Sequence, residues 1–423
     1  MKISLAFGRS GLTADIPDDR LAGVLTMRGA PPVESPEAAL AASLAAPIGG
    51  PPLAELARGR RSACVVICDI TRPVPNSLIL PPILRTLEEE GIARDAITIL
   101  IATGLHRPST SGEREQLVGP EIAEKYRIVD HHAREQDEQQ ALGTTRNGTP
   151  VAIDRIYCEA ELKITTGFIE PHLMAGFSGG RKLIAPGCAW DGTIKALHSP
   201  SFLENPECRE GSIEENPLHH ELLAIAELAG HDFIVNVSLD QEHRITGIFS
   251  GEPLAAHAKG ITFVRSAVRG TIPEPADIVV TTAAGYPLDL TYYQAIKGMT
   301  AALPVVREGG TLILVAECAE GLGSPEFVEM ATSFPSHEAF TERLRREPVV
   351  IDQWQLEECA KAARKAEVIL VSPRVASEWG SSLFVTAVAT LDEALSRGRK
   401  KQGEKARIAV IPHGPYTLVE AGA

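Results

Sequence analysis

The sequence predicts an α/β protein built as two α/β domains with mostly parallel sheets. The chain has 423 residues, 44% of them hydrophobic, which is too long for one ordinary core. Residues 64–68 are short and wholly apolar, and residues 96–102 are apolar except for Thr98, as expected of strands buried on both faces. The stretch 78–90 between them is an amphipathic helix pattern that ends at Gly91, so strands and helices alternate.

The first predicted domain covers residues 1–270. Its opening 60 residues carry weak signals: an edge strand at 3–7 and helices at 38–44 and 53–58. The turn NGTP at 147–150 predicts a hairpin. The remaining elements expected here are strands at 127–129, 151–153, 161–166, 232–239 and 245–249, and helices at 217–228 and 254–268.

A second α/β rhythm predicts another domain, residues 276–405. The segment GTIPEP at 270–275 is a plausible linker between the two. A last strand at 406–411 could return to either domain, and residues 406–423 would then join the first. The other elements expected are strands at 277–282, 311–316 and 368–372, and helices at 290–299, 340–345 and 356–363.

Composition excludes several classes of partner. The net charge of −14 and the pI near 5.4 argue against nucleic acid, although local cations still allow an anionic small molecule. No apolar run approaches the length of a membrane span, and the start MKISLAFGRSG lacks the apolar core of a signal peptide. The seven cysteines are scattered and form no CxxC pair, as expected of reduced thiols in a cytoplasmic protein.

Polar side chains follow three of the predicted strands. Asp69 and Arg72 follow the first, His106 the second, and His172 a third. In open α/β sheets, ligands bind beyond the carboxyl ends of the strands, so we expect these loops to meet at one crevice. Taken alone, Asp69 could simply cap a turn and His106 could be a surface histidine.

Residues 167–182 combine glycines with the basic pair Arg181 and Lys182. Glycines let the backbone approach a ligand closely and leave N–H groups free for an anion. A lysine beside them can meet a phosphate or, when desolvated, act as a nucleophile. This is not a Walker A loop, because Arg181 stands where that motif needs glycine.

Other candidates have two interpretations each. His198 is either a helix cap or, if its loop folds back, a metal ligand. Tyr293 and Lys297 share a helix face that could line a site or be solvated. Trp354 could close a pocket or pack between domains. The neighbouring histidines at 131–132 and 219–220 are expected to be structural or exposed, because adjacent side chains rarely point at one ion.

In their order and spacing, these motifs resemble the nickel-pincer lactate racemase family over nearly the whole chain. The motifs are D-x-T-R-P-V-P (69–75), A-T-G-x-H-R-P-S (102–109), G-F-I-E-x-H-x-x-A-G-F-S-G-G-R-K (167–182), H-S (198–199), G-Y-P-L-D (285–289), Y-Q-A-x-K-G-M-T-A-A (293–302), D-Q-W (352–354) and T-L-D-E-A (390–394). The resemblance implies two α/β domains with the active site in the cleft between them.

The resemblance also implies a cofactor, the nickel-pincer nucleotide. This is a pyridinium-3-thioamide-5-thiocarboxylic acid mononucleotide that holds Ni(II), and a planar set of two sulfurs, one carbon and one nitrogen suits that ion. Lys182 is then the covalent attachment point and His198 the protein ligand to nickel. The residues expected to seat the nucleotide are Asp69, Gly176, Ser178, Gly179 and Gly180.

The reaction implied by the resemblance is racemisation of a small, lactate-like 2-hydroxy acid. Hydride would leave C2 for the cofactor, a planar 2-keto acid would form, and hydride would return to the other face. His106 and His172 are the expected acid/base groups, one for each enantiomer. The expected substrate-binding residues are Arg72, Lys297, Tyr293, Gln294 and Trp354.

Two alternatives stay open at this point. One is a C2 epimerase or racemase of a longer sugar acid or a dicarboxylic hydroxy acid with the same cofactor. The other is a non-enzymatic nucleotide- or hydroxy-acid-binding protein. Leu173, Met174 and Leu290 favour an apolar pocket and a short aliphatic substrate. Cofactor attachment implies maturation proteins as partners.

Overall fold

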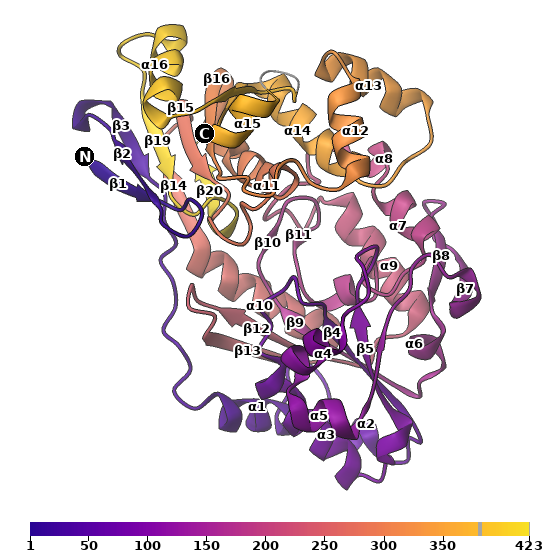
Figure 1. Ribbon diagram of the computed structural model, residues 1–423. Helices are drawn as coiled ribbons and strands as arrows, with labels where there is room; N and C mark the ends of the chain where they lie inside the picture. Colours follow the sequence, from indigo (N-terminus) through magenta and orange to yellow (C-terminus); the bar gives the residue numbers. More distant parts are fainter. Residues whose placement is uncertain (380–382, 423) are drawn as a thin grey trace.

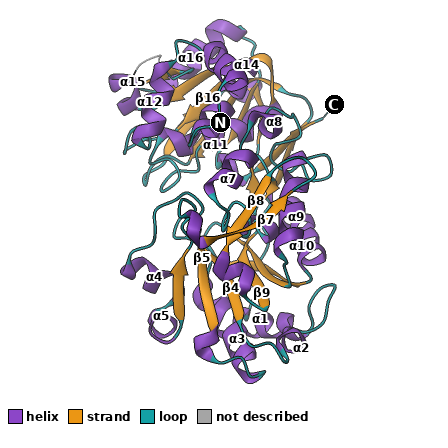
Figure 2. Ribbon diagram, turned by 90° about the vertical axis from the view of Figure 1, so that its right-hand side faces the viewer, coloured by secondary structure: helices purple, strands orange, loops and turns teal. Residues whose placement is uncertain are grey.

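The computed structural model describes residues 1–379 and 383–422 and contains two six-stranded sheets. Each sheet forms the centre of one lobe, with helices around it (Figures 1 and 2). In spatial order, the first sheet is β13 (Ile245–Gly251), β12 (Phe233–Leu239), β9 (Leu162–Phe168), β4 (Ala63–Cys68), β5 (Ile97–Ala102) and β6 (Arg127–Asp130). The second is β18 (Thr386–Val388), β17 (Glu367–Val371), β16 (Val306–Val315), β15 (Ala276–Thr282), β19 (Ile408–Ile411) and β3 (Leu21–Val24).

The predicted fold class, α/β with mostly parallel sheets, is confirmed. In the first sheet β13 pairs antiparallel with β12, and the other neighbours are parallel. All five pairings of the second sheet are parallel. Parallel neighbours need crossovers, and helices supply them on both faces of each sheet.

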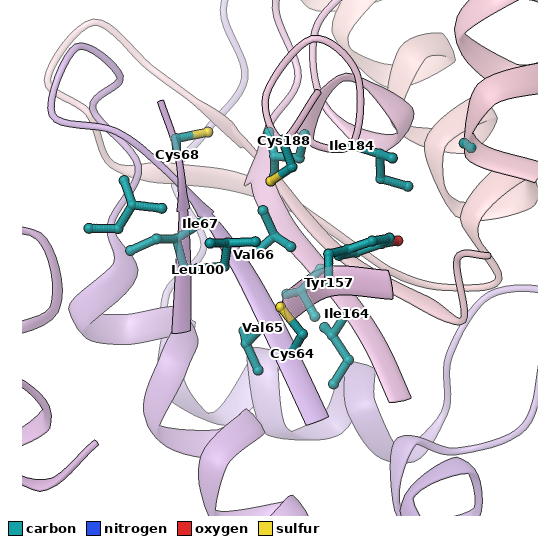
Figure 3. Packing of buried hydrophobic residues seen from close by; sticks show 14 of the residues in the cluster. Cys64, Val65, Val66, Ile67, Cys68, Leu100, Tyr157, Ile164, Ile184 and Cys188 are labelled. Carbon is teal, nitrogen blue, oxygen red and sulfur yellow. The ribbon is translucent and has the colours of Figure 1, made fainter. Parts of the chain in front are cut away.

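The burial of strand β4 explains why its sequence is apolar throughout. All six of its residues are buried, because helices cover both faces of the first sheet. Figure 3 shows Val65, Val66 and Ile67 packed among Leu100 and Tyr157. Burying one such side chain stabilises the fold by about 1.5–3 kcal/mol. The seven cysteines are free, and six of them are buried, as the sequence predicts for thiols that fill a core.

The second sheet separates two hydrophobic cores, and successive side chains of its strand β15 enter one core and then the other. Val279 of β15 belongs to the core under α11 (Tyr292–Ala302), while its neighbours Ile278 and Val280 belong to the core under α16 (Leu391–Gln402). Successive side chains of a strand point to opposite faces, so a strand covered on both faces is apolar at every position.

The remaining helices are mostly short. They are α1 (Pro36–Ala45), α2 (Leu53–Ala57), α3 (Asn76–Glu89), α4 (Ser111–Val118), α5 (Pro120–Lys125), α6 (Arg155–Glu159), α7 (Asp191–Leu197), α8 (Pro200–Leu203), α9 (Pro217–Ala229), α10 (Pro253–Val268), α12 (Pro325–Ser333), α13 (His337–Arg346), α14 (Gln353–Lys365) and α15 (Pro373–Glu378). Within the described part of the chain, none has the length and apolar character needed to cross a membrane.

Four two-stranded ladders complete the fold. They are β1 (Lys2–Leu5) with β2 (Leu12–Asp15), β7 (Gln139–Thr144) with β8 (Pro150–Asp154), β10 (Pro171–His172) with β11 (Gly176–Phe177), and β14 (Arg269–Ile272) with β20 (Leu418–Ala421). The ladder of β7 and β8 contains the hairpin predicted from NGTP.

Strand membership differs from the predicted division at two places. The expected linker at 270–275 begins inside β14, which pairs with β20 near the end of the chain. Strands β3 and β19, from opposite ends of the sequence, pair with each other in the second sheet. In Figure 1 they lie side by side, indigo against yellow. Residues 21–24 therefore lie in the second sheet, although the predicted first domain included them.

The order of strands places a crevice at each sheet. From β4, the chain moves to β5 and β6 on one side and later to β9 on the other. From β15 it moves to β16, β17 and β18, and later returns to β19 on the opposite side. Loops that leave neighbouring parallel strands in opposite directions open a crevice at the carboxyl ends, where ligands bind.

Candidate active site

A cavity of about 660 Å³ lies between the two lobes, and residues of both form its wall. The loops after β4, β5 and β9 meet there, which confirms the convergence expected from the sequence. The predicted site residues in the wall are Asp69, Arg72, His106, Ser178, Gly179, Lys182, His198, Tyr293, Gln294 and Trp354. His172 and Lys297 stand behind the wall, each in contact with a wall residue.

Asp69, directly after β4, holds His106, which follows β5. Asp69 Oδ2 lies 2.7 Å from His106 Nδ1, and Oδ1 accepts the Thr71 hydroxyl at 2.6 Å. Burial raises the pKa of Asp69, but His106, Thr71 and Arg72 outweigh it and the net pKa is lowered. The ionised carboxylate accepts, so His106 donates from Nδ1 and keeps an unprotonated Nε2. His106 is thereby prepared to act as a base.

His172 has the opposite arrangement of its ring nitrogens. Its Nδ1 lies 3.3 Å from the backbone nitrogen of Met174 and 3.2 Å from that of Ala175. A backbone N–H can only donate, so Nδ1 accepts, and a neutral ring carries its proton on Nε2. His172 Nε2 lies 3.0 Å from Lys182 Nζ. The imidazole therefore donates to a lysine that is an uncharged amine.

The charges around Lys182 agree with this assignment. Burial lowers the pKa of Lys182 well below its usual value, and Arg72 and Arg181 lower it further. Burial and the neighbouring Lys182 and Arg72 likewise hold the pKa of His172 well below its usual value. A desolvated, uncharged lysine amine is a nucleophile, the second of the two roles considered from the sequence.

The glycine-rich segment is shaped by one asparagine of β12. Gly179 lines the cavity at φ +79°, and a Cβ there would come within 2.7 Å of Asn236 Oδ1. Gly180 donates its N–H to the same oxygen at 2.8 Å. A Cβ on Gly176 would lie 1.9 Å from the Ser212 carbonyl oxygen. Gly176 and Gly180 lie outside the cavity wall and allow close packing, while Ser178 and Gly179 line the cavity.

His198 caps the carboxyl end of α7 and also faces the cavity, so its two sequence interpretations are compatible. Its Nδ1 lies 2.8 Å from the Ile194 carbonyl oxygen, which can only accept, so Nε2 keeps its lone pair. Burial lowers the pKa of His198 to about 4, so the ring is neutral at neutral pH. The ring of Trp354, from the second domain, lies 4.6 Å away between centroids. A neutral imidazole held by a backbone carbonyl is a suitable metal ligand.

Helix α11 brings the second domain's polar groups to the cavity. It starts at Thr291, whose hydroxyl accepts the Gln294 N–H at 3.3 Å. Lys297 Nζ donates to Gln294 Oε1 at 2.7 Å, and Trp354 Nε1 donates to the Tyr293 hydroxyl at 3.2 Å. Burial and then Arg72 lower the pKa of Lys297 to about 8. The face that carries Tyr293 and Lys297 therefore belongs to the site and is not a solvated surface.

The sequence assigned no role to the wall residues Arg134, Glu320 and Asp352, nor to Glu170, which contacts the wall residue Arg72. Glu170, between β9 and β10, forms an ion pair with Arg72 through Nη1. The motif at 167–182 contains this acid, but its partner is 98 positions away. A single acidic residue in an apolar and glycine-rich segment was the available signal.

Of the adjacent histidines that the sequence left as structural or exposed, His131, His132 and His220 have hydrogen-bond partners, whereas the buried His219 Nδ1 has none among the described residues. His131 is buried, with Nδ1 2.8 Å from Asp154 and Nε2 2.9 Å from the Ala189 carbonyl oxygen. His220 Nε2 lies 2.8 Å from the Glu214 carbonyl oxygen. Within residues 1–379 and 383–422, no three His, Cys, Asp or Glu side chains are grouped so as to hold a metal ion.

Comparison with known proteins gives matches over the whole chain. Residues 7–211 match the Lactate racemase N-terminal domain family, and residues 272–419 match the Lactate racemase C-terminal domain family. The lactate racemase of Thermoanaerobacterium thermosaccharolyticum is 36% identical over 422 residues, 99% of each chain. That of Lactiplantibacillus plantarum is 37% identical over 425 residues, again 99% of each.

Solved structures agree with these matches. The structure of the lactate racemase apoprotein from T. thermosaccharolyticum has a TM-score of 0.93 and 35% identity, and covers 99% of this chain and 100% of that one. A Thermotoga maritima protein of 17% identity, with a TM-score of 0.69, covers 91% of this chain and 98% of its own and shares the fold.

Two α/β domains that enclose paired histidines, an uncharged lysine and cations from both sides define an enzyme with an interdomain active site. The matches over its full length identify the enzyme family: the chain belongs to the lactate racemase family. It is a racemase, and thus an isomerase. The non-enzymatic alternative is thereby excluded.

Proposed function

We propose that this racemase inverts C2 of a small 2-hydroxy acid, lactate or a close analogue, with a nickel-pincer nucleotide attached to Lys182. The observation that carries the proposal is the grouping of Lys182, His198 and both candidate bases around one cavity. The lactate racemases that match this chain end to end support the choice of substrate.

The residues present fit such a cofactor. Lys182 offers an uncharged amine for attachment, and His198 offers an unprotonated Nε2 for nickel. His198 would be the protein ligand to that nickel, and the cofactor would supply the other donors. When bound, this cofactor supplies a centre that accepts hydride from C2 and returns it. Ser178 and Gly179 would contact its nucleotide part.

The substrate carboxylate would be held by one cation from each domain. Arg72 extends from the loop after β4 and Lys297 from α11. The Arg72 charge lowers the pKa of Lys297, and both charges lower the pKa of His172. An arginine can bind a carboxylate with two parallel hydrogen bonds. Tyr293, Gln294 and Trp354 close the second domain's side of the cavity and would exclude water.

His106 would take the hydroxyl proton of the substrate at Nε2. When His106 takes up this proton it becomes an imidazolium, which the ionised Asp69 stabilises from 2.7 Å away. His172 would serve the opposite face of the planar keto acid. Its proton stands on Nε2 in this structure, so it would first act as the donor to the substrate oxygen.

The experiment compares matured protein with matured Lys182→Ala and with Lys259→Ala, a control at an exposed lysine of α10. Intact mass should show an adduct in the wild type and in Lys259→Ala that is missing in Lys182→Ala. Nickel content and racemisation of pure L- or D-lactate should follow the adduct. An adduct that persists in Lys182→Ala would reject the attachment site, and matured protein that leaves both lactate enantiomers unchanged would reject the substrate.

A further inference from the structure

The backbone of Glu170 is held in place by Ser178. The Glu170 N–H donates to the Ser178 hydroxyl at 3.0 Å, and the Glu170 carbonyl accepts the Ser178 N–H at 2.9 Å. The same hydroxyl donates to the Phe168 carbonyl oxygen at 2.9 Å. These three hydrogen bonds fix the backbone from which the Glu170 side chain extends, next to the wall residues Phe168 and Ser178.

The Arg72 guanidinium contacts the Glu170 carboxylate, and two lysines, Lys182 and Lys297, lie within reach of its charge. Glu170 pairs with Arg72 through Nη1, and the pair is only partly exposed, 32% for Arg72 and 14% for Glu170. Burial lowers the pKa of Lys182 and Lys297, and the Glu170 charge opposes this effect. At Arg72 burial also acts to lower the pKa, but Glu170 and its other neighbours outweigh it and the pKa is raised. Without a counter-charge, Arg72 and Lys297 would repel each other across the cleft.

Two other nearby carboxyl groups are not available for this task. Asp69 is occupied by His106 and Thr71. Burial raises the pKa of Glu210 to about 8, so this residue is a neutral acid at neutral pH, 3.4 Å from the Thr300 hydroxyl. The counter-charge to Arg72 and Lys297 therefore falls on Glu170.

We infer that Glu170 is a positioning residue for the substrate carboxylate, because it holds the Arg72 guanidinium by one nitrogen. The inference rests on the proposed function, in which Arg72 and Lys297 bind that carboxylate. A guanidinium has five N–H donors in a planar fork, so a partner at Nη1 leaves the edge formed by Nε and Nη2 free for a second carboxylate. Glu170 thus directs Arg72 without taking the place of the substrate.

Replacing Glu170 by Gln keeps the shape and removes the charge. Arg72 then loses the partner that fixes its orientation. Lys297, already shifted to a pKa of about 8 by burial, loses a neighbour that supports its charge, so its pKa falls further. Binding of a carboxylate should weaken at neutral pH, and the loss should grow as the pH rises from about 6 to about 8.5.

The test measures binding of oxamate, an unreactive analogue of a 2-keto acid, to the full chain by calorimetry across that pH range. Matured protein supplies KM and kcat for lactate in parallel. Glu170→Gln should raise Kd and KM about tenfold or more, change kcat less, and move the pH at which affinity is lost to a lower value. Glu170→Asp keeps the charge and should recover part of the affinity. Glu124→Gln, at an exposed position, is the control.

Two outcomes would overturn the inference. Unchanged binding in Glu170→Gln would leave Glu170 without a positioning role, and tighter binding would mean that it competes with the substrate for Arg72. Arg72→Met and Lys297→Met separate these results from a failure of the proposed function. If those two variants also bind oxamate normally, the carboxylate site itself is misplaced; if they lose binding while Glu170→Gln does not, only the inference on Glu170 fails.

Discussion

Lys182 Nζ and His172 Nε2 lie 3.0 Å apart, and the backbone on the far side of the imidazole decides which of them donates. Because His172 Nδ1 accepts from the N–H groups of Met174 and Ala175, its ring proton stands on Nε2, and Lys182 must be the acceptor. An ammonium group has no lone pair and could not take this position.

The first prediction is that Lys182 reacts as an uncharged amine near neutral pH in the chain before cofactor attachment. Acetic anhydride is small enough for the cavity, and the mass of each lysine-containing peptide gives the extent of acylation at each pH. Lys182 should reach half-maximal reactivity far below pH 10.4, the usual lysine pKa. Lys259 in the same digest is the exposed control. Equal pH dependence for the two lysines would contradict the neutral pair.

The second prediction concerns the partner of His106. Asp69→Asn removes the charge that stabilises the imidazolium and fixes the tautomer, so kcat of matured protein should fall by about 10²–10⁴-fold. Thr71→Val removes one hydrogen bond to Asp69 and keeps the carboxylate, so its loss should be much smaller. Similar losses in both variants would show that Asp69 acts through local structure and not through His106.

The third prediction assigns one enantiomer to each histidine. His106→Ala and His172→Ala should each abolish racemisation, because a full turnover uses both groups. Each should still convert one enantiomer to the bound keto acid, and the enantiomer should differ between them. Single-turnover absorbance after mixing each matured variant with each pure enantiomer measures this, against an expected contribution of about 10²–10⁴-fold for one base. Loss of the same enantiomer in both variants would reject the assignment.

The fourth prediction is about stability and pH. Glu357 of α14 is fully buried, and neither of its oxygens makes an ordinary hydrogen bond with a described residue. Burial raises its pKa to about 8, partly opposed by Lys361. The unfolded chain ionises near pH 4.3 while the folded chain still holds the proton, so Glu357 lowers stability as the pH rises from about 4.3 to 8.

Glu357→Gln should therefore stabilise the protein by about 1–3 kcal/mol at pH 8 and by little at pH 4.5. Denaturant unfolding at the two pH values measures the difference. Glu329→Gln, on the partly exposed helix α12, should change stability little at either pH. A gain of the same size at both pH values would contradict the linkage to a proton.

Local signals were enough to predict the six strands of the first sheet and the meeting of their loops, but not the short helices α4, α5, α6 and α7. The run at 64–68 is apolar because the strand is buried on both faces, and polar residues follow where the strand ends. Both signals lie within about ten positions of the sequence. The pairing of β14 with β20 and of β3 with β19 was not predictable in this way. Each joins segments from distant parts of the chain, and no local pattern specifies a partner.

The candidate site shows the same limit. Residues of contiguous motifs, such as Lys182 and His198, were predicted because reactive side chains lie close together in that part of the sequence. The direction of each hydrogen bond was beyond reach, because it depends on backbone donors that only the folded hairpin brings to His172. Glu170 lacked a role for the same reason, since its partner Arg72 lies on another loop.

The pairing of β3 with β19 has a consequence for synthesis on the ribosome. The strands of the first sheet lie between residues 63 and 251, so this sheet can form while the rest of the chain is still being translated. Strand β3 emerges early and must wait for residues 408–411 before it has a neighbour. A recombinant fragment that starts at residue 272 would never receive β3 and would expose the edge of β19 to other chains. We therefore expect such a fragment to aggregate, even though it contains five of the six strands of its sheet.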